Sequence, residues 1–307
     1  MDKTALLLLG FNRPENLRKR LNEISKNKRV PLIVSIDGGA SQDKKTMIIK
    51  IINDFKIQNP EISTKSIYRE KNLGLAKHIT TAISEVIANF EYCIVVEDDI
   101  NIGENFVENM INGQVVFESS NALTLGGFSP ISGKYRAWSR KNRFRETIYF
   151  SAWGWMTSAE KWKCYRLEID PISNHAELSN SESWGSLSSY KQQIWLRRFL
   201  KVSIQNPPTW DFQMQYVTFS KNLTHLLPVY RFCDNTGFND SLSTHTTGRR
   251  PRWMGPEGRI DCRPIPSGTS ITRKNYLGRI LMLFDSIFVA GDSEIVKVHR
   301  LLRGIRI

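Results

Sequence analysis

Short apolar runs alternate with helix-length amphipathic segments through the first hundred residues, and this alternation limits the folds that the chain can adopt. The apolar runs have the length of buried strands, and the segments between them have the length of helices. We expect strands over residues 6–9, 31–36, 63–68 and 92–96, and helices over residues 14–26, 43–55 and 75–89. Strands and helices that alternate in this way build an α/β layer around a mostly parallel sheet.

The fourth expected strand ends abruptly in three acids, Glu97, Asp98 and Asp99. Three adjacent carboxylates are tolerable at a solvated strand end, or where a cation and hydrogen-bond donors neutralise them. Asp37 follows the second expected strand, and Arg13 follows the first. Because ligands of parallel sheets bind outside the carboxyl ends of the strands, these side chains are expected at one edge. The pattern indicates a divalent-metal or sugar-nucleotide site, with an acidic helix N-terminus as the alternative.

Composition and missing motifs exclude several classes of protein. No G-x-G-x-x-G follows the first strand and no Walker loop is present, so the usual dinucleotide and P-loop sites are excluded. The net charge of +13 suits nucleic acid, an anionic membrane or phosphorylated substrates, but no nucleic-acid-binding module is recognisable. Four cysteines without a C-x-x-C pair indicate neither a zinc site nor a disulfide framework, which favours a cytoplasmic location. The apolar run at residues 4–9 is too short for a secretory signal.

Four segments, taken in order, resemble one family. They are Phe-Asn-Arg-Pro at residues 11–14, Ser-Ile-Asp-Gly-Gly at 35–39, Arg-Glu-Lys-Asn-Leu-Gly-Leu at 69–75 and Val-Val-Glu-Asp-Asp at 95–99. Over residues 4–247 the chain resembles inverting glycosyltransferases of the GT-A fold, a Rossmann-like α/β fold with a mostly parallel central sheet. The nearest resemblance is to bacterial sugar transferases of surface-polysaccharide assembly, and a more distant one is to eukaryotic N-acetylglucosaminyltransferase I.

The resemblance implies roles for the residues at the strand ends. Glu-Asp-Asp corresponds to the DxD-type motif of that family, so Asp99 is the expected ligand of Mn²⁺ or Mg²⁺, while Glu97 and Asp98 face the donor sugar and ribose. Asp37 is expected to meet the uracil or ribose of a UDP-sugar, and Arg13 the base or the phosphates. From the residues alone, Asp37 equally suits an ordinary turn and Arg13 a surface ion pair.

An aromatic run with a central glycine occupies residues 150–157 and contains Trp153 and Trp155. Aromatic faces stack on sugar rings, but the same composition is typical of a core segment. The resemblance implies that this segment lines the donor and acceptor pocket. We therefore expect Trp153 and Trp155 to be donor-binding residues, with core packing as the alternative.

Asp211 stands between Trp210 and Phe212 at the start of an apolar helical pattern. An acid at this position is typical of a helix cap. In the resembled family the aspartate of a Trp-Asp motif here is the general base that takes the acceptor's proton. One base without a protein nucleophile implies a single displacement, so the expected stereochemical outcome is inversion.

A strand-like segment over residues 226–232 leads into a long polar loop over residues 233–247. A loop of this length is either disordered or functional. The resemblance places a similar Gly…Thr-His segment near the metal and the diphosphate, so His245 is expected to touch one of them. The alternative is a histidine with a purely structural role.

The final segment, residues 249–307, holds 12 Lys and Arg against 5 Asp and Glu, an excess of 12 − 5 = +7. Residues 280–289 are apolar but too short to cross a bilayer. They suit an interfacial helix, a core helix or a dimer helix. We expect a catalytic domain over residues 1–247, with a nucleotide-binding half (1–100) and an acceptor half (101–247), followed by a helical basic extension over residues 248–307.

The sequence therefore predicts a metal-dependent inverting glycosyltransferase that moves a sugar from a UDP-sugar to a hydroxyl of a bacterial surface glycan or lipid-linked oligosaccharide. It is expected in the cytoplasm, with peripheral contact to the anionic inner face of the membrane, and with no nucleic-acid partner. A nucleotidyltransferase that makes nucleotide sugars is one alternative, although residues 10–14 match its Gly-rich basic loop poorly. A nucleotide- or glycan-binding protein without turnover is the other.

Overall fold

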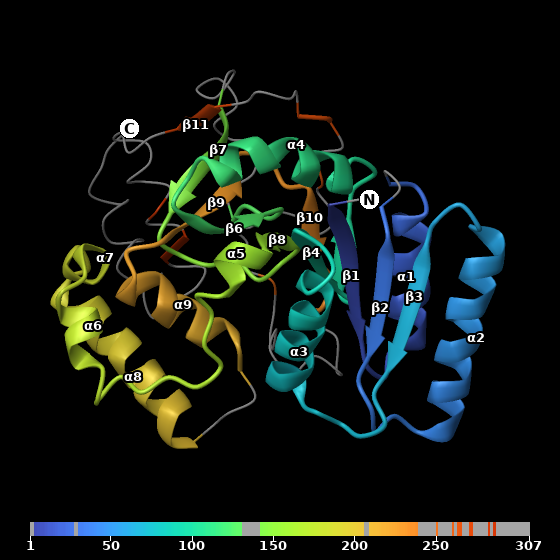
Figure 1. The fold of residues 1–307 in the computed structure, drawn as a ribbon, viewed down its shortest axis with the longest axis horizontal. Helices are drawn as coiled ribbons and strands as arrows, with labels where there is room; N and C mark the ends of the chain where they lie inside the picture. Colours follow the sequence, from blue (N-terminus) through green and yellow to red (C-terminus); the bar gives the residue numbers. More distant parts are fainter. Residues whose placement is uncertain are drawn as a thin grey trace.

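The computed structural model describes residues 3–27, 30–130, 142–205 and 209–238, and further along residues 250, 260, 263–265, 270–272, 282 and 285–286. Within these residues a nine-stranded sheet crosses the molecule with helices on both faces (Figure 1). In spatial order its strands are β11 (Ser270–Thr272), β7 (Asn142–Thr147), β9 (Thr224–Pro228), β6 (Ala122–Gly126), β8 (Trp155–Ser158), β4 (Tyr92–Glu97), β1 (Thr4–Gly10), β2 (Leu32–Ile36) and β3 (Thr64–Tyr68).

The first four strands are parallel, with β1 between β2 and β4 and with β3 beside β2. They are joined by α1 (Pro14–Ile24), α2 (Gln42–Gln58) and α3 (Leu75–Ile87). Pro14 begins α1, where its missing N–H costs nothing because the first helical N–H groups have no partner within the helix. These elements match their predicted ranges to within a few residues. The predicted α/β class with a mostly parallel central sheet is confirmed.

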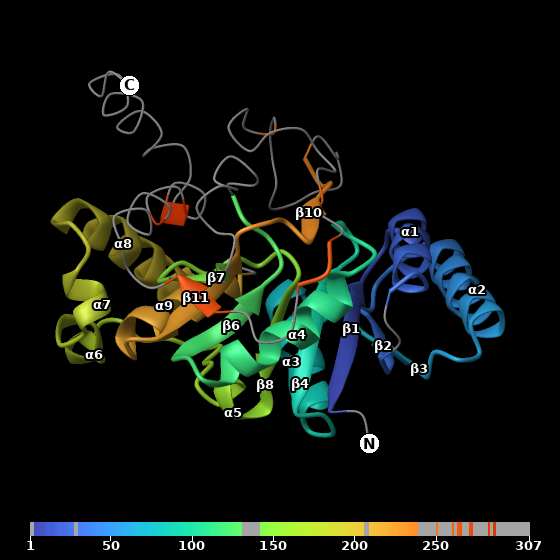
Figure 2. The same ribbon diagram turned by 90° about the horizontal axis from the view of Figure 1, so that it is seen from above.

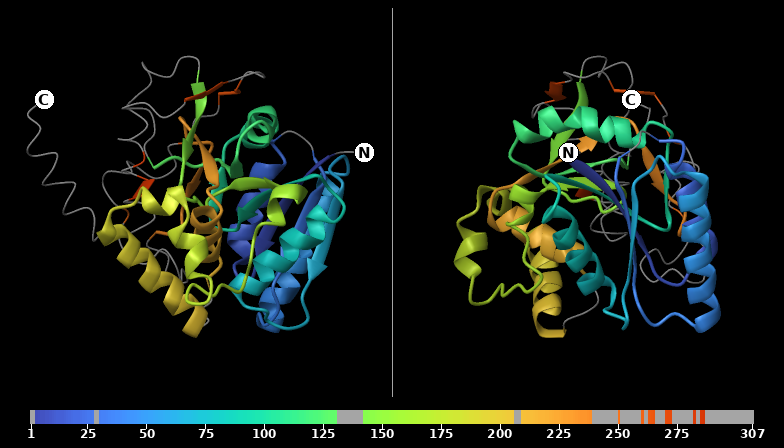
Figure 3. Two further views of the ribbon diagram at one scale, coloured as in Figure 1. Left: turned by 60° about the vertical axis from the view of Figure 1, so that its left-hand side comes forward. Right: turned by 45° about the vertical axis from the view of Figure 1, so that its right-hand side comes forward.

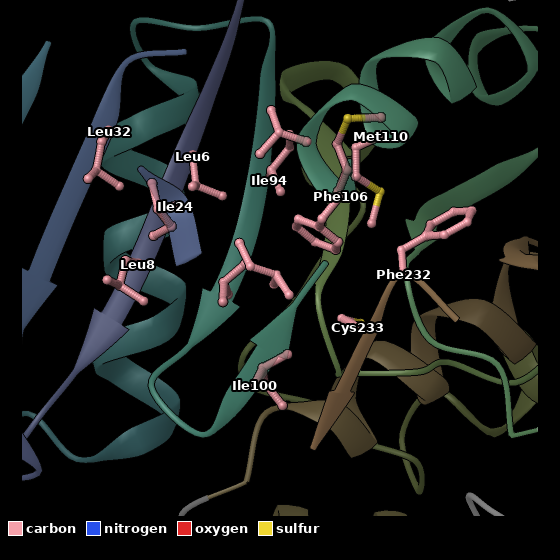
Figure 4. Close-up of a cluster of buried hydrophobic side chains, with 14 of the residues drawn as sticks. Leu6, Leu8, Ile24, Leu32, Ile94, Ile100, Phe106, Met110, Phe232 and Cys233 are labelled. Carbon is pink, nitrogen blue, oxygen red and sulfur yellow. The ribbon is translucent and has the colours of Figure 1, made fainter. Parts of the chain in front are cut away.

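Both faces of β1 are covered, which explains its continuous apolar sequence. Leu6 and Leu8 point to the face covered by α1 and α2, where they join Ile24 and Ile94 (Figure 4). Leu7 points to the opposite face, in the cluster that contains the α3 side chains. Successive residues of one strand thus supply two separate cores.

The later part of the sheet has mixed strand directions. Strand β8 is antiparallel to both of its neighbours, β4 and β6, and so joins the N-terminal strands to the later ones. Beyond it, β9 is parallel to β6 and β7 is antiparallel to β9. The helices of this part are α4 (Phe106–Glu118), α5 (Ala159–Trp162), α6 (His175–Ser179), α7 (Glu182–Gly185), α8 (Ser189–Gln205) and α9 (Asp211–Ser220).

Helices α6–α9 gather at the end of the molecule away from α1 and α2 (Figures 2 and 3). Their buried side chains are largely aromatic. The ring centroid of Trp195 lies 5.6 Å from those of Phe199 and Phe219, and Trp184 lies 5.8 Å from Phe219. These rings pack in the same cluster as Leu7 and the other β1 residues of that face.

The strand predicted over residues 226–232 is wrong in its extent. Strand β9 ends at Pro228, and the Val229 N–H makes one further hydrogen bond, to the Arg143 carbonyl at 2.9 Å. A separate strand, β10 (Cys233–Asn235), follows and pairs antiparallel with β5 (Ile100–Ile102) outside the main sheet. Residues 229–232 therefore connect the main sheet to the β10–β5 pair instead of extending β9.

The described residues of the C-terminal extension are attached to the preceding body. Strand β11 pairs with β7, and Ile265 N–H donates to the Asn109 side chain at 2.7 Å. Asp285 is 1% exposed and pairs through both oxygens with Arg145 of β7. Of the apolar stretch 280–289, residues 282 and 285–286 are described, and the burial of Asp285 and Ser286 favours the core-packing alternative there. None of the described helices combines the length and apolar character that a membrane span needs.

Candidate functional site

The three consecutive acids lie where β4 ends. Leu9 of β1 pairs with Glu97 of β4, so the two central strands end at the same edge of the sheet. After Asp98 and Asp99 the chain continues into β5, which pairs with β10. The acids therefore occupy the turn between the two sheets, at the carboxyl edge where ligands of α/β sheets bind.

Arg13 lies beside two of these acids. It immediately precedes α1, and its Nη1 atom is 3.4 Å from Asp98 Oδ1 and 3.5 Å from Asp99 Oδ2. The three side chains are only 11–17% exposed, so the pairing is shielded from solvent. The surface ion pair considered from the sequence is thus a largely buried contact within the acidic turn.

Burial dominates the electrostatics of the acidic turn. It raises the pKa of Glu97 well above the ordinary value, and the negative charges of Asp99 and Asp98 raise that pKa further. The charge of Asp211 adds to the same shift, so Asp211 lies within electrostatic range of the turn although it is far away in sequence. Burial also raises the pKa of Asp99, with Arg13 opposing it. Carboxylates whose charged form is disfavoured in this way gain when a cation approaches.

A second arginine near the turn was not predicted. Arg20 is 3% exposed and donates to Glu23 Oε2 at 2.5 Å, and the same oxygen accepts the Ile102 N–H at 2.9 Å. Burial lowers the pKa of Arg20, while the nearby acids, including Asp98 and Asp99, oppose this shift. Its spacing from Arg13 could have indicated it. Arg20 lies seven residues after Arg13, and two helical turns bring such residues to one face.

Asp37 organises the loop that precedes α3. Its Oδ1 accepts the N–H groups of Gly38 and Leu73, both at 2.9 Å, and its Oδ2 accepts the Gly74 N–H at 3.2 Å. A Cβ atom at Gly38 would lie 2.4 Å from the backbone of Lys71, so only glycine allows this close approach. The turn interpretation therefore describes what Asp37 does here, and contact with a nucleotide stays a prediction.

The two tryptophans proposed for the donor pocket occupy different environments. Trp153 is partly exposed, and its ring lies 4.4 Å from Phe128 and 5.7 Å from Phe238. Trp155 is fully buried in β8 and stacks on Trp210 with ring centroids 5.4 Å apart. Trp155 has no exposed surface, which favours the core alternative for it, and its contact with a donor stays a prediction. Trp153 remains the candidate for a sugar contact.

Asp211 is the first residue of α9, and Trp210 occupies the N-cap position without a side-chain cap hydrogen bond. The carboxylate accepts the Thr209 hydroxyl and the N–H of its neighbour Phe212 on the same oxygen, Oδ1. Phe150 packs against Trp210 with centroids 5.4 Å apart. The aromatic run and the start of α9 are thereby held together, which fixes the backbone beside Asp211.

His245 lies outside the described residues, but the residues on both sides of it can be placed. Thr236 donates its N–H (3.0 Å) and its hydroxyl (3.1 Å) to the carbonyl oxygen of Asp99. Arg250 donates through Nη2 to both oxygens of the fully buried Asp234, each at 2.9 Å. The chain therefore leaves the Asp99 turn at residue 236 and returns to β10 at residue 250.

The side chains at the turn supply only some of the ligands that a hard divalent cation needs. Asp99 offers the carboxylate oxygens that Mn²⁺ and Mg²⁺ prefer, and its burial favours a cation. Among the residues that the structure describes, no group of three or more His, Cys, Asp or Glu side chains is arranged to hold a metal ion. A metal held here would therefore take most of its ligands from a diphosphate, from water or from residues outside that description.

No protein-family model and no curated protein matches the chain. The similar solved structures include the mannosyltransferase PcManGT from Pyrobaculum calidifontis in complex with GDP-Man and Mn²⁺, at 9% identity and a TM-score of 0.43, covering 71% of this chain and 69% of that one. S. aureus TarS 1–349 in complex with UDP has 14% identity, a TM-score of 0.38 and coverages of 74% and 57%. The glycosyltransferase GlyE of Streptococcus pneumoniae has 10% identity, a TM-score of 0.36 and coverages of 74% and 45%. At these scores the likeness carries no conclusion about substrates or residue roles.

Proposed function

We propose that the protein is a metal-dependent inverting glycosyltransferase that transfers a sugar from a UDP-sugar to a hydroxyl of a bacterial surface glycan or lipid-linked oligosaccharide. The observation that carries the proposal is the meeting of two acidic elements from distant parts of the chain. Val95 of β4 pairs with Trp155, whose ring stacks on Trp210, so Asp211 at the start of α9 lies near the end of β4. In keeping with this, the charge of Asp211 contributes to the raised pKa of Glu97. A transferase needs both a leaving-group site and a base, and these elements supply one each.

In this proposal the acidic turn holds the donor. Asp99, together with His245, would hold Mn²⁺ or Mg²⁺, which when bound supplies Lewis-acid stabilisation of the departing diphosphate. Glu97 and Asp98 face the donor sugar and ribose, and Arg13 turns from the acids to the phosphates. Asp37 meets the uracil or ribose from the loop that it organises, and Trp153 offers its ring to the sugar.

Asp211 acts as the general base. The acceptor oxygen forms a bond to the anomeric carbon while its proton passes to the Asp211 carboxylate. The bond between the anomeric carbon and the diphosphate oxygen breaks at the same time, and its electron pair leaves with the diphosphate. One displacement inverts the configuration at the anomeric carbon.

The remaining features concern location and domain organisation. A cytoplasmic protein with a basic extension would approach a lipid-linked acceptor at the anionic inner face of the membrane. We keep the boundary near residue 247 as a proposal, although the contact between Asp285 and Arg145 ties the extension to the body. Contact with the membrane would then come from basic side chains, since electrostatic attraction needs no inserted helix.

The first experiment is calorimetric binding of UDP, GDP, CDP and TDP, each with and without Mn²⁺. We expect tight binding of UDP that appears only with the metal, followed by transfer from a UDP-sugar in an acceptor screen. Absence of nucleotide binding under every condition would favour a glycan-binding protein. Release of pyrophosphate from a nucleoside triphosphate and a sugar phosphate would favour the nucleotidyltransferase.

Two variants test the residue roles. Asp211→Asn should lower kcat about 10²–10⁴-fold while UDP binding is retained, because a general base contributes about that factor. Asp99→Ala should abolish the metal-dependent binding of UDP. Asp43→Asn, an exposed acid on α2, is the matched control and should change neither property. Unchanged transfer by Asp211→Asn would remove the proposed base.

A further inference from the structure

The two oxygens of the Asp211 carboxylate differ in their hydrogen bonds to the described residues. Oδ1 accepts both the Thr209 hydroxyl and the Phe212 N–H, the latter at 3.1 Å. Within the part of the chain that the structure describes, no group donates to Oδ2 of Asp211. The two donors therefore distinguish two oxygens that are chemically equivalent in an isolated carboxylate.

Thr209 is itself fixed by its surroundings. It is 8% exposed, and its carbonyl oxygen accepts the side-chain amide of Gln213 at 2.8 Å. The next carbonyl, of Trp210, accepts the Tyr165 hydroxyl at 3.2 Å. The Tyr165 ring in turn stacks on Trp162 at 4.5 Å with an interplanar angle of 3°. The Thr209 hydroxyl thus belongs to a segment in which the carbonyl groups of Thr209 and Trp210 are both hydrogen-bonded.

The surroundings also explain why Asp211 needs such a contact. Asp211 is partly exposed, and Trp210 beside it stacks on Trp155, which pairs with Val95 two residues before Glu97 of the other acidic element. It also lies near Tyr165, whose pKa is raised chiefly by burial and further by the Asp211 charge. A partly exposed carboxylate that is repelled by a neighbouring acid would sample several rotamers without a local donor. A hydrogen bond from a buried hydroxyl selects one of them.

We propose that Thr209 is a positioning residue that fixes the Asp211 carboxylate so that Oδ2 is the oxygen that receives the acceptor's proton. This inference rests on the proposed function, in which the acceptor O–H bond breaks as the new bond to the anomeric carbon forms. The proton goes to Oδ2, while Oδ1 keeps its two hydrogen bonds throughout. The contribution of Thr209 therefore belongs to the chemical step and not to donor binding, because the proposed donor contacts lie on the turn after β4, on the Asp37 loop and at Trp153, and none lies at Thr209.

The test compares Thr209→Val, which removes the hydroxyl with little change of shape, with Thr209→Ser, which keeps it. We expect Thr209→Val to lower kcat by about tenfold or more, because small misplacements of a catalytic group are costly. KM for the donor and the affinity for UDP should stay within about twofold of wild type, as expected when an interaction serves only the transition state. Thr209→Ser should restore most of the lost kcat.

Thr157→Val is the matched control. Thr157 is fully buried, and its hydroxyl donates to the Leu123 carbonyl at 3.0 Å, so the variant also loses one buried hydrogen bond but leaves the start of α9 untouched. Its kcat should equal that of wild type. A similar fall in kcat for Thr157→Val would show that the effect at Thr209 is general destabilisation.

Several results would overturn the inference. Wild-type kcat in Thr209→Val, or failure of Thr209→Ser to exceed Thr209→Val, would show that the hydroxyl does not position the base. If the valine variant does not fold by circular dichroism, Thr209→Ala tests the same hydroxyl with a smaller side chain. A wild-type protein that transfers no sugar from any donor would instead overturn the proposed function, so the two failures are distinguishable.

Discussion

The N-terminal part of the molecule, residues 3–97, and the later part, residues 142–228, are packed with different side chains. In the first part the buried strand residues are mainly Leu, Ile and Val, and each strand alternates between two apolar faces. In the later part tryptophan, tyrosine and phenylalanine dominate the core between α8, α9 and the sheet. Aliphatic side chains need only a close fit, whereas Trp, Tyr and neighbouring polar groups also need hydrogen-bond partners when they are buried.

The later part contains such partners for its buried polar side chains, although Trp155 Nε1 and the Tyr216 hydroxyl are buried without one among the described residues. His225 is fully buried between the hydroxyls of Thr124 and Thr218, each 2.8 Å from a ring nitrogen. The side chain of Gln215 accepts the Phe150 N–H at 3.0 Å and donates to the Ile148 carbonyl at 2.6 Å. Regular β-α packing thus supports the acidic turn after β4, while a polar and aromatic core supports the start of α9 with Asp211.

The largest change in the free energy of unfolding should come from truncating one core side chain in each part. Trp195→Ala should lower the free energy of unfolding by about 4 kcal/mol and Leu8→Ala by about 3 kcal/mol, because a larger side chain leaves a larger cavity and more lost contacts. Both side chains are at most 1% exposed. Urea denaturation measures both values, with the exposed Ile172→Ala as the control. A larger loss of unfolding free energy for Leu8→Ala than for Trp195→Ala would contradict this expectation.

The two buried histidines give a second comparison, through pH. Burial lowers the pKa of His225 from 6.5 to about 3 and that of His78 from 6.5 to about 4. His78 also faces Asp37 and Glu85, which raise its pKa, and Arg69, which lowers it. Both rings stay neutral in the folded protein while the unfolded chain takes up protons. The free energy of unfolding should therefore fall as the pH drops below 6.5.

At pH 5 each histidine should account for a loss of about 2 kcal/mol, at about 1.4 kcal/mol per pH unit. Below pH 4 only His225 continues to contribute, because its pKa in the folded state is the lower one. Unfolding curves from pH 7 to pH 3.5 for wild type, His225→Gln and His78→Gln measure this. If His225→Gln kept the wild-type slope, the neutral-ring assignment would be wrong.

The smallest effect is expected at the surface of the N-terminal part. Arg69 and Glu85 form two hydrogen bonds, of 2.7 and 2.8 Å, but the Glu85 side chain is 41% exposed. Glu85→Gln should change the free energy of unfolding by less than about 1 kcal/mol, and by less still in high salt, because solvent and ions screen such pairs. A loss comparable with that of Leu8→Ala would show that surface charge matters more here than core packing.

The same contrast explains what could be predicted from the sequence. Strands β1–β4 and helices α1–α3 follow local periodicity, so their ranges were predicted to within a few residues. The insertion of β8 between β4 and β6 depends on contacts between distant segments, which periodicity does not report. The full burial of Trp155 follows from the rings of Phe150, Trp162 and Trp210, which pack against it on its face of the sheet.

The candidate site divides in a similar way. Clustered acids after a strand and an acid at a helix start are visible in the sequence, which is why Asp99 and Asp211 were singled out. The contacts near them were not visible, because the pairing of Arg20 with Glu23 and the hydrogen bond from Thr209 to Asp211 depend on a side-chain geometry that only the folded chain creates. Asp37 shows the reverse case. It is conspicuous in the sequence, but its carboxylate accepts backbone N–H groups of the loop that precedes α3.

The ion pair between Arg145 and Asp285 has a consequence for how the chain is made. Arg145 lies within the main sheet at 3% exposure, and the acid that compensates it is 140 residues further along the chain. When a protein emerges from the ribosome N-terminus first, all the described strands, β1 to β11, are made before this partner exists. The guanidinium must therefore stay hydrated until the last part of the chain arrives. Truncation before residue 285 should give a chain that aggregates during synthesis instead of a shorter stable protein.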